Sequence, residues 1–209
     1  MATCRFLGRS CIEIKGLQDH IIIDPNYSKA PLSDINTIFF THEHEDHVNI
    51  KKLNEIREKY AVKNSSLQMY GPRSVKNEYN LDLKRIKNGE KIRLNNFIVK
   101  AFEVECYKSK ECLAYVINKG DIKLLHTADS SEFSNKLRNP MSQIDYCFIA
   151  CFEDQFPNYL EFLEELRPVI TFPYHFDPGQ EKMAKKLSEF LNENGIESKF
   201  IEIGTEFEF

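Results

Sequence analysis

Short apolar runs separated by turn residues open the chain and predict a β-meander. Apolar side chains alternate or cluster at Cys4 to Gly8, Cys11 to Lys15 and His20 to Asp24, and Gly16 to Asp19 supplies a turn. Ile35 to Phe40 follows as a fourth predicted strand, which runs directly into a loop rich in histidine. The chain is therefore expected to form several strands before its first helix.

Helical spacing first appears after this loop. From Val48 to Tyr60 the apolar residues recur at 48, 50, 53, 56 and 60, which places them on one face of a helix. A short strand at Leu67 to Tyr70 and a turn at Gly71-Pro72 are expected next. The basic, polar connector at Lys84 to Asn96 then closes the first half of the chain.

The second half repeats this order of strands followed by helices. Turn signals at Ser109, Gly120 and Asn139-Pro140 separate its strands. Tyr159 to Arg167 is predicted to be a helix, because the spacing is helical and a proline follows it. The predicted strands are Phe97 to Glu105, Cys112 to Asn118, Ile122 to His126, Ile144 to Cys151 and Val169 to Pro173.

A second histidine lies between a strand and a helix near the end of the chain. Val169 to Pro173 leads into His175, and Asp177 is expected to cap a last helix that ends at Gly195. Each half thus contains one unit of strand, histidine and helix. This repetition predicts a pseudo-symmetric α/β sandwich with a site at the shared edge of the two halves.

Length and composition fit this fold. With 209 residues, of which 42% are hydrophobic, the chain can build a substantial core, and we expect a single domain over 1–209 with halves of approximately 1–95 and 96–209. A net charge of -4 gives no support for nucleic-acid binding. The start lacks the apolar segment of a signal peptide, and no apolar run is long enough for a membrane span.

The six cysteines form no C-x-x-C pair, so a zinc knuckle or a thioredoxin motif is not expected. Reduced thiols fit a cytoplasmic protein. These features together favour a soluble cytoplasmic protein without a membrane partner. The sequence gives no indication of an oligomeric state.

Half of the six histidines lie in the segment Thr41 to His47, which also holds an aspartate. Alternate residues of an extended segment point the same way, so His42, His44 and Asp46 would share one side, and a turn would bring His47 round to it. Such a loop can serve two adjacent ions. Imidazole and carboxylate donors suit zinc, and iron or manganese would accept the same donors. The alternative is a solvated polar loop.

Further ligands would have to come from distant parts of the chain. His175 is a candidate because its position mirrors the histidine loop; the alternative is a capping or core histidine. Asp129, three residues after His126, could bridge two cations through its two oxygens or cap a turn or helix. His20, at the start of an early strand, is expected to be structural.

The sequence resembles the metallo-β-lactamase superfamily over nearly its whole length. The segments that carry the resemblance are Phe6-Leu7-Gly8, Ile21 to Pro25, Thr41 to His47, Thr127-Ala128-Asp129 and Pro173-Tyr174-His175. Its short tail after His175 is most similar to the ascorbate-6-phosphate lactonase-like group of metal-dependent hydrolases. The resemblance implies a four-layer αββα sandwich with a binuclear metal site at its edge.

The resemblance also implies which residues bind the two metals. Asp24 matches a position that usually supports the histidine loop without binding metal. The matched ligands are His42 and His44 for the first metal, Asp46, His47 and His175 for the second, and Asp129 as the bridging carboxylate.

One position departs from the family pattern. The family normally supplies a third histidine to the first metal after the strand that corresponds to Phe97 to Glu105, and Cys106 stands there instead. A thiolate binds zinc well, at about 2.3 Å, so the cysteine is a candidate replacement ligand. The alternatives are a buried cysteine that leaves the first metal weakly held, or ligation by Glu105.

The resemblance favours a metal-dependent hydrolase that cleaves a small ester, lactone or phosphodiester bond. A hydroxide held between two zinc ions would attack the substrate. Asp46 would hold the proton of the nucleophile, and His175 would steady the substrate or leaving group. The alternative from another class is a non-catalytic metal-binding or ligand-sensing domain with a degenerate first metal site. Redox regulation through Cys106 is a third possibility.

Overall fold

The computed structural model describes residues 1–63, 66–130, 132–134, 137 and 143–209. Within these residues the strands form two sheets. The first sheet has the spatial order β13 (Glu206–Glu208), β1 (Thr3–Gly8), β2 (Cys11–Lys15), β3 (His20–Ile23), β4 (Thr37–Phe39), β5 (Gln68–Gly71) and β6 (Lys84–Arg85). The second has the order β12 (Ile170–Tyr174), β11 (Tyr146–Ala150), β10 (Ile122–His126), β9 (Cys112–Lys119), β8 (Ile98–Val104) and β7 (Lys91–Arg93).

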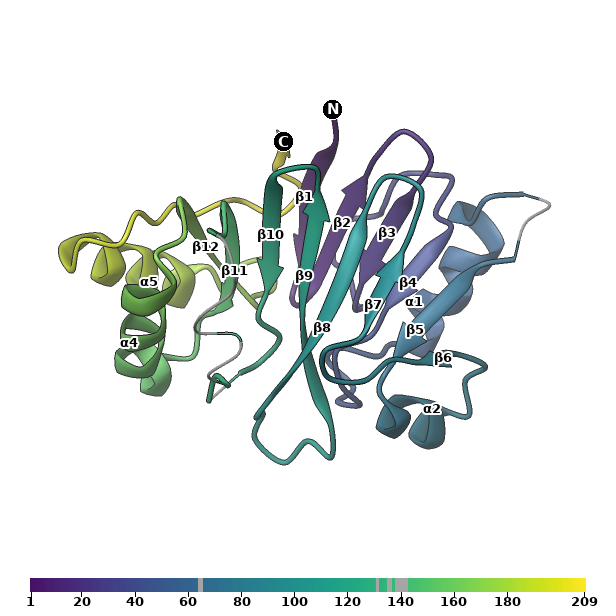
Figure 1. Cartoon of the computed structure of the whole chain (residues 1–209), viewed down its shortest axis with the longest axis horizontal. Coiled ribbons are helices and arrows are strands. Elements are labelled where there is room, and N and C mark those ends of the chain that lie inside the picture. Colours follow the sequence, from purple (N-terminus) through teal and green to yellow (C-terminus); the bar gives the residue numbers. More distant parts are fainter. Residues whose placement is uncertain (64–65, 131, 135–136, 138–142) are drawn as a thin grey trace.

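Helices lie on the outer side of each sheet (Figure 1). One group consists of α1 (Ile50–Glu55), the π-helix η1 (Ile56–Tyr60) and α2 (Arg73–Tyr79). The other consists of the 3-10 helix η2 (Glu153–Gln155), α4 (Phe156–Leu166) and α5 (Lys182–Glu193). The predicted αββα sandwich is confirmed. No helix among the described residues has both the length and the apolar character that a bilayer crossing requires.

Both sheets are mixed, and their parallel parts position the site. Strands β3 to β6 run parallel in the first sheet, and β10 to β12 run parallel in the second. The carboxyl ends of β4 and β12 lead into His42 and His175, respectively. Ligand sites of α/β proteins commonly lie at such strand ends.

Strand β3 shows why the central strands are apolar on consecutive positions. Ile21 and Ile23 point into the large core that includes the space between the sheets, and Ile22 points into a second core beside α1 and α2. All three side chains are fully buried. Because helices cover the outer face of the sheet, a run without polar alternation is required here.

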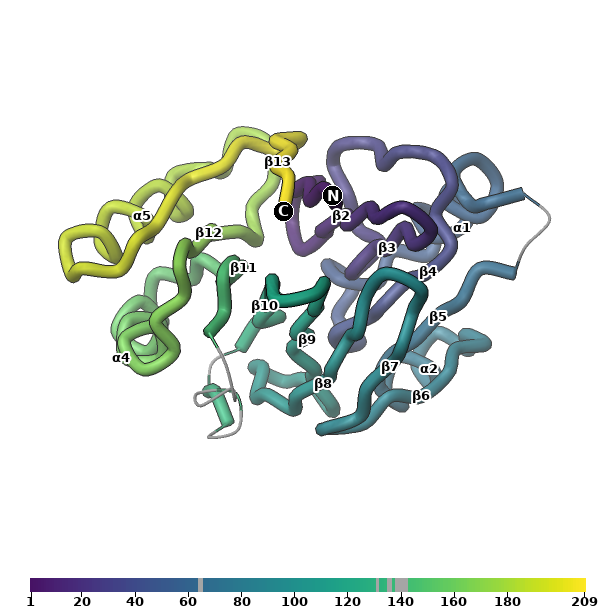
Figure 2. The backbone as a smooth tube through the Cα atoms, turned by 45° about the horizontal axis from the view of Figure 1, so that its top comes forward, coloured from purple at the N-terminus to yellow at the C-terminus, as the bar shows by residue number. Residues whose placement is uncertain are grey.

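The last strand joins the two ends of the described chain. Strand β13 pairs antiparallel with β1, and the backbone N–H of Phe209 donates to the carbonyl of Ala2 at 2.9 Å. The C-terminal end therefore lies beside the N-terminal end, and the tube in Figure 2 shows the same arrangement. The two sheets consequently do not divide at residue 95, since β7 belongs to the second sheet and β13 to the first.

Several predicted boundaries differ from the structure. The last helix begins at Lys182 and not at Asp177, because the Asp177 carboxylate pairs with Arg9 and accepts a hydrogen bond from Ser28 at 3.0 Å. The helix predicted over Val48 to Tyr60 begins at Ile50 with Asn49 as its cap.

Other elements were not predicted at all. These are α2 after Pro72, the short strands β6 and β7 inside the polar connector, and β13. The turn predicted at Asn139-Pro140 lies outside the described residues.

Candidate metal centre

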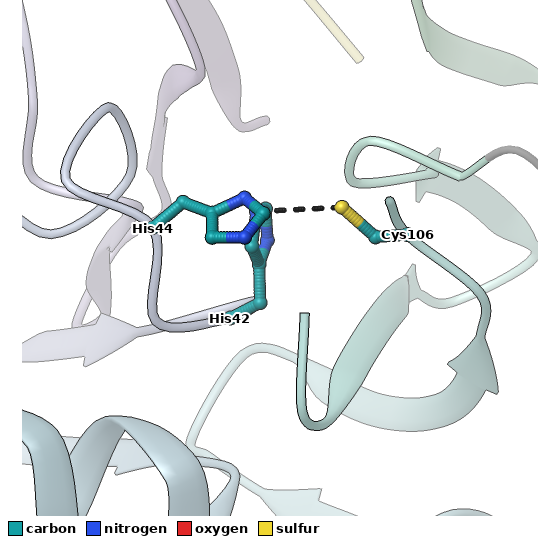
Figure 3. Close-up of side chains that lie close together, drawn as sticks. All are labelled: His42, His44 and Cys106. Carbon is teal, nitrogen blue, oxygen red and sulfur yellow. Dashed lines mark hydrogen bonds between the residues drawn. The ribbon is translucent and has the colours of Figure 1, made fainter. Parts of the chain in front are cut away.

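The first group of candidate ligands consists of His42, His44 and Cys106. The histidines come from the loop after β4, and the cysteine comes from the hairpin between β8 and β9. Nε2 of His42 lies 3.1 Å from Nδ1 of His44 and 3.7 Å from Sγ of Cys106. The sulfur points toward both rings (Figure 3). The structure thus brings the cysteine to the position where a third ligand was expected.

The second group consists of Asp46, His47, Asp129 and His175, whose ligand atoms all lie within 4.8 Å of one another. Oδ2 of Asp129 lies 3.0 Å from Nε2 of His47 and 3.3 Å from Nε2 of His175. Asp46 approaches the same nitrogen of His175 at 3.3 Å. The two groups are adjacent, because the rings of His42 and His47 have centroids 3.9 Å apart.

Buried polar atoms at the centre of the second group have no hydrogen-bond partner. They are Nε2 of His47, Nε2 of His175 and Oδ1 of Asp129. The histidine nitrogens are close to carboxylate oxygens but are not oriented for hydrogen bonds. Buried donors and acceptors are normally satisfied, so such atoms around one point indicate a cation site. The unpartnered Oδ1 also leaves Asp129 an oxygen for a second ion.

The distances fit tetrahedral coordination. Two nitrogen or oxygen donors of one zinc ion lie about 3.3 Å apart, and a nitrogen and a sulfur lie about 3.6 Å apart. The pairs described above are separated by 3.0 to 3.3 Å and by 3.7 Å. The residues present therefore fit two divalent ions in adjacent positions.

The electrostatics of the second group favour positive charge. Burial lowers the pKa of His47, but the carboxylates of Asp129 and Asp24 outweigh it and raise that pKa well above its ordinary value. The same balance of burial against Asp129 and Asp46 raises the pKa of His175 to about 9. Burial raises the pKa of Asp129, and the nearby histidines lower it overall. A site that retains protons so strongly is suited to a metal cation.

Asp24 organises the histidine loop from behind. Its Oδ1 accepts the backbone N–H of Thr41 at 2.8 Å, and its Oδ2 accepts the Thr41 hydroxyl at 2.7 Å. The same Oδ2 lies 2.7 Å from Nδ1 of His47. This contact fixes the His47 ring with Nε2 toward Asp129, an arrangement in which a carboxylate orients a metal-binding histidine. The supporting role that the resemblance implied for Asp24 agrees with this geometry.

Glu43 connects the histidine loop to the hairpin of Cys106. Its Oε1 accepts the backbone N–H of Lys110 at 2.6 Å, and its Oε2 accepts the hydroxyl of Ser109 at 3.3 Å. Tyr79 donates to the Glu43 carbonyl at 2.8 Å. Sequence reasoning missed this residue, because a side chain that turns away from its neighbours in the loop leaves no periodic signal.

Backbone strain is concentrated around the two groups. Of the described non-glycine residues with positive φ, five lie in or beside the site: Arg9, Asp24, Lys108, Ala128 and His175, with φ values of 50° to 73°. Left-handed conformations of such residues are costly and are typical of functional sites. The site therefore depends on surrounding contacts to hold its backbone.

The remaining candidates lie outside both groups. His20 contacts Glu13 at 2.9 Å and the carbonyl of Ser33 at 3.0 Å, so it is structural, as its position predicted. His126 contacts the carbonyl of Ser10 at 3.2 Å, and its ring packs against Tyr174. Glu105 is exposed and belongs to neither group.

A cleft of about 340 Å³ opens over the centre. The described residues that line it are His44, Cys106, Tyr107, Asp129, Phe152, Asp154 and Gln155. Ligands from both groups are therefore accessible from one cavity. Asp154 and Gln155 belong to η2, and Phe152 directly precedes it; no sequence motif marks this segment.

Comparisons with known proteins define the class of this chain. A family model described as "Beta-lactamase superfamily domain" matches residues 17–192, so this chain belongs to the metallo-β-lactamase superfamily. The lactonase-like group suggested by the tail remains a prediction.

Individual relatives are distant. The UPF0173 protein of Pyrococcus abyssi is 27% identical over 178 residues, which cover 81% of this chain and 80% of the relative. Among solved structures, Igni18, a metallo hydrolase of Ignicoccus hospitalis, is 16% identical with a TM-score of 0.76 and coverage of 100% and 99%. CmlA, a diiron β-hydroxylase of Streptomyces venezuelae, is 14% identical with a TM-score of 0.77, covering 100% of this chain and 54% of CmlA.

Proposed function

We propose that this protein is a zinc-dependent hydrolase that cleaves a small ester, lactone or phosphodiester bond at a binuclear centre. The observation that carries the proposal is the pair of adjacent ligand groups beneath a cleft, the second of which contains buried, unpartnered nitrogen and oxygen atoms. Membership of the metallo-β-lactamase superfamily and the likeness to a metallo hydrolase support it.

The ligands are assigned by their grouping. His42, His44 and Cys106 would hold the first ion, and Asp46, His47 and His175 the second, with Asp129 between the two ions. Two divalent ions, when bound, supply Lewis acidity and lower the pKa of water toward 7. The proposal includes a single domain over 1–209. It also includes a cytoplasmic setting, in which six unpaired thiols would stay reduced.

Asp46 and His175 are the residues proposed to act on the reactants. The Asp46 side chain is 33% exposed, and the His175 side chain is 11% exposed. Ser10 and Asn26 donate hydrogen bonds to the Asp46 carbonyl, at 3.0 and 2.9 Å, and fix its backbone. Asp46 can therefore hold the proton of the attacking water while His175 orients the substrate or leaving group.

The fold also occurs in the diiron hydroxylase CmlA, so the fold alone determines neither the metal nor the reaction. The choice of zinc and of hydrolysis therefore rests on the donor set. A thiolate with two imidazoles is a soft set that favours zinc over manganese. An iron centre is the alternative that metal analysis would distinguish.

Metal content and turnover test the proposal together. We expect two ions per chain by elemental analysis, and we expect both His44→Ala and Asp129→Ala to lose bound metal and hydrolytic activity in parallel. Glu45→Ala is the matched control, since Glu45 is an exposed residue of the same loop. Unchanged turnover in a metal-depleted variant would contradict the mechanism. One ion or none, without turnover of ester, lactone or phosphodiester substrates, would instead support the non-catalytic binding domain.

A further inference from the structure

The cleft has an outer wall that no part of the proposed mechanism uses. Tyr107 lies on one side, in the hairpin that carries Cys106, and Phe152 and Asp154 lie at the start of the segment that leads into α4. These side chains come from two segments that are distant in the chain, and they line the same cleft as His44, Cys106 and Asp129. They are therefore positioned to contact the part of a substrate that does not react.

Two of these side chains are aromatic. Tyr107 is 74% exposed, although it is a large side chain. Phe152 packs against the ring of His175 with a centroid distance of 5.0 Å. Apolar walls beside a few polar groups are typical of pockets for small organic molecules. An apolar substrate group can thus lie between Tyr107 and Phe152 while the reacting bond lies over the ligands.

Asp154 places a carboxylate at the same mouth. It is exposed, and its Oδ2 accepts a hydrogen bond from the side-chain amide of Gln155 at 3.0 Å. The neighbouring Glu153 points elsewhere and pairs with Lys186. A carboxylate in the cleft attracts a cationic substrate group and repels an anionic one.

The tyrosine ring already contacts a cation. The ammonium of Lys108, which does not line the cleft, lies 4.8 Å from the centroid of the Tyr107 ring. Aromatic faces attract ammonium groups through the ring quadrupole. Lys108 occupies one face of this ring, and its charge opposes that of Asp154, so a cationic substrate group would contact Asp154 and the other face of Tyr107.

Cys106 makes the charge of the metal centre less positive than a histidine ligand would. A histidine ligand is neutral, whereas a zinc-bound cysteine is a thiolate. With Asp46, Asp129 and Cys106 as ligands, three negative charges oppose the four positive charges of two divalent ions. A histidine in place of Cys106 would leave one more positive charge, so this centre attracts anions less strongly.

We infer that the cleft selects carboxylic esters or lactones without negative charge, prefers those that carry a cationic group, and disfavours phosphodiesters. This inference rests on the proposed hydrolase function. In the reaction, water adds to the acyl carbon, the bond from that carbon to the alcohol oxygen breaks, and the acid and the alcohol are released. Asp154 and Tyr107 are specificity-determining residues.

Matched 4-nitrophenyl esters test the inference in the zinc-loaded protein. The acyl groups are butyrate, its 4-trimethylammonio derivative and hemisuccinate, and bis(4-nitrophenyl) phosphate is the phosphodiester. We expect kcat/KM to fall in the order cationic, neutral, anionic ester, with the phosphodiester below all three. Highest turnover of the hemisuccinate or of the phosphodiester would overturn the inference.

Charge variants assign the selectivity to Asp154. Asp154→Asn should reduce the ratio of cationic to anionic ester turnover by about fivefold for each unit of substrate charge. This is the effect expected from one charge at roughly 8 Å in an effective dielectric of about 40. Asp154→Lys should reverse the order. Glu153→Gln and Glu153→Lys make the same charge changes one residue away and should leave the order of ester turnover unchanged. Equal effects at both positions would contradict a specific role for Asp154.

Binding without turnover separates this inference from the proposed function. Calorimetry of the zinc-loaded protein should show tighter binding of phenyltrimethylammonium than of benzenesulfonate, and Asp154→Lys should invert this order. If no substrate is hydrolysed but the binding order holds, the hydrolase proposal fails and the charge selectivity of the cleft stands. If substrates are hydrolysed and benzenesulfonate binds more tightly than phenyltrimethylammonium, the inferred charge selectivity of the cleft is wrong.

Discussion

One oxygen of the Asp24 carboxylate lies 2.7 Å from Nδ1 of His47 and directs the opposite nitrogen of that ring toward the proposed second metal. Both side chains are fully buried. The contact explains how a histidine inside a short loop maintains one orientation.

Asp24→Asn therefore tests the orientation of His47. The amide still fills the space but is a weaker acceptor, and we expect a loss of about 10 to 100-fold in zinc affinity. Competition with a chromophoric chelator measures this loss. Asp19→Asn is the control, because Asp19 is a buried carboxylate that contacts Asn95 and Asn96 away from the centre. An equal loss of zinc affinity in both variants would contradict the orienting role.

Cys106 is predicted to be a ligand of the first ion. The cobalt-substituted protein should show a thiolate-to-cobalt charge-transfer band, and Cys106→Ser should remove the band and weaken one of the two sites. Cys106→His should keep two ions without the band, since imidazole is an equivalent donor. Cys4→Ala, at a buried thiol outside both ligand groups, should leave the spectrum unchanged. Persistence of the band in Cys106→Ser would show that Cys106 is not the ligand.

Glu43 is predicted to position Cys106 through the hairpin. Glu43→Ala removes the acceptor for the Lys110 N–H, and we expect a weaker cobalt-thiolate band and at least about tenfold weaker binding at the first site. The second site should retain its ion. Glu45→Ala is matched in residue type and loop. If Glu43→Ala weakens both sites equally, the substitution disturbs the whole histidine loop and does not act specifically on the position of Cys106.

His126 gives a prediction for stability at acid pH. Burial lowers its pKa to about 4, so the unfolded chain binds the proton more readily below pH 6.5. The stability that depends on neutral His126 is complete above pH 6.5 and is lost as the pH falls toward 4. Between pH 7.5 and 5 this group contributes a loss of about 2 kcal/mol.

Urea unfolding of metal-free protein at these two pH values measures the loss. In His126→Gln the decrease in unfolding free energy over the same range should be smaller by about 2 kcal/mol. The comparison uses metal-free protein throughout, so that loss of zinc at low pH does not contribute. An identical pH dependence in both proteins would show that His126 does not titrate as described.

Strands that are covered on both faces were predictable from sequence, because burial leaves long apolar runs such as Ile21 to Ile23. The start of α5 was not predictable, since the Asp177 carboxylate that was expected to cap the helix pairs with Arg9, 168 residues away in the chain. Helix α2 and strand β13 are short and mostly polar, and tertiary contacts define them. Local patterns do not report such long-range pairing.

The candidate ligands were predictable because the histidine loop and His175 follow strands that end at one edge. The geometry of Cys106 was not, because its approach to His42 depends on the hairpin and on Glu43. The cleft residues Tyr107, Phe152 and Asp154 also required the fold, since nothing in their sequence neighbourhoods distinguishes them from surface residues.

The two ligand groups are assembled from segments that extend from His42 to His175, and an unfolded chain does not hold these segments together. Metal occupancy and folding are therefore thermodynamically linked. For each bound ion, a tenfold rise in free metal above its dissociation constant would add about 1.4 kcal/mol to the free energy of unfolding. In a cell, the supply of metal would thus set the lifetime of the protein as well as its activity.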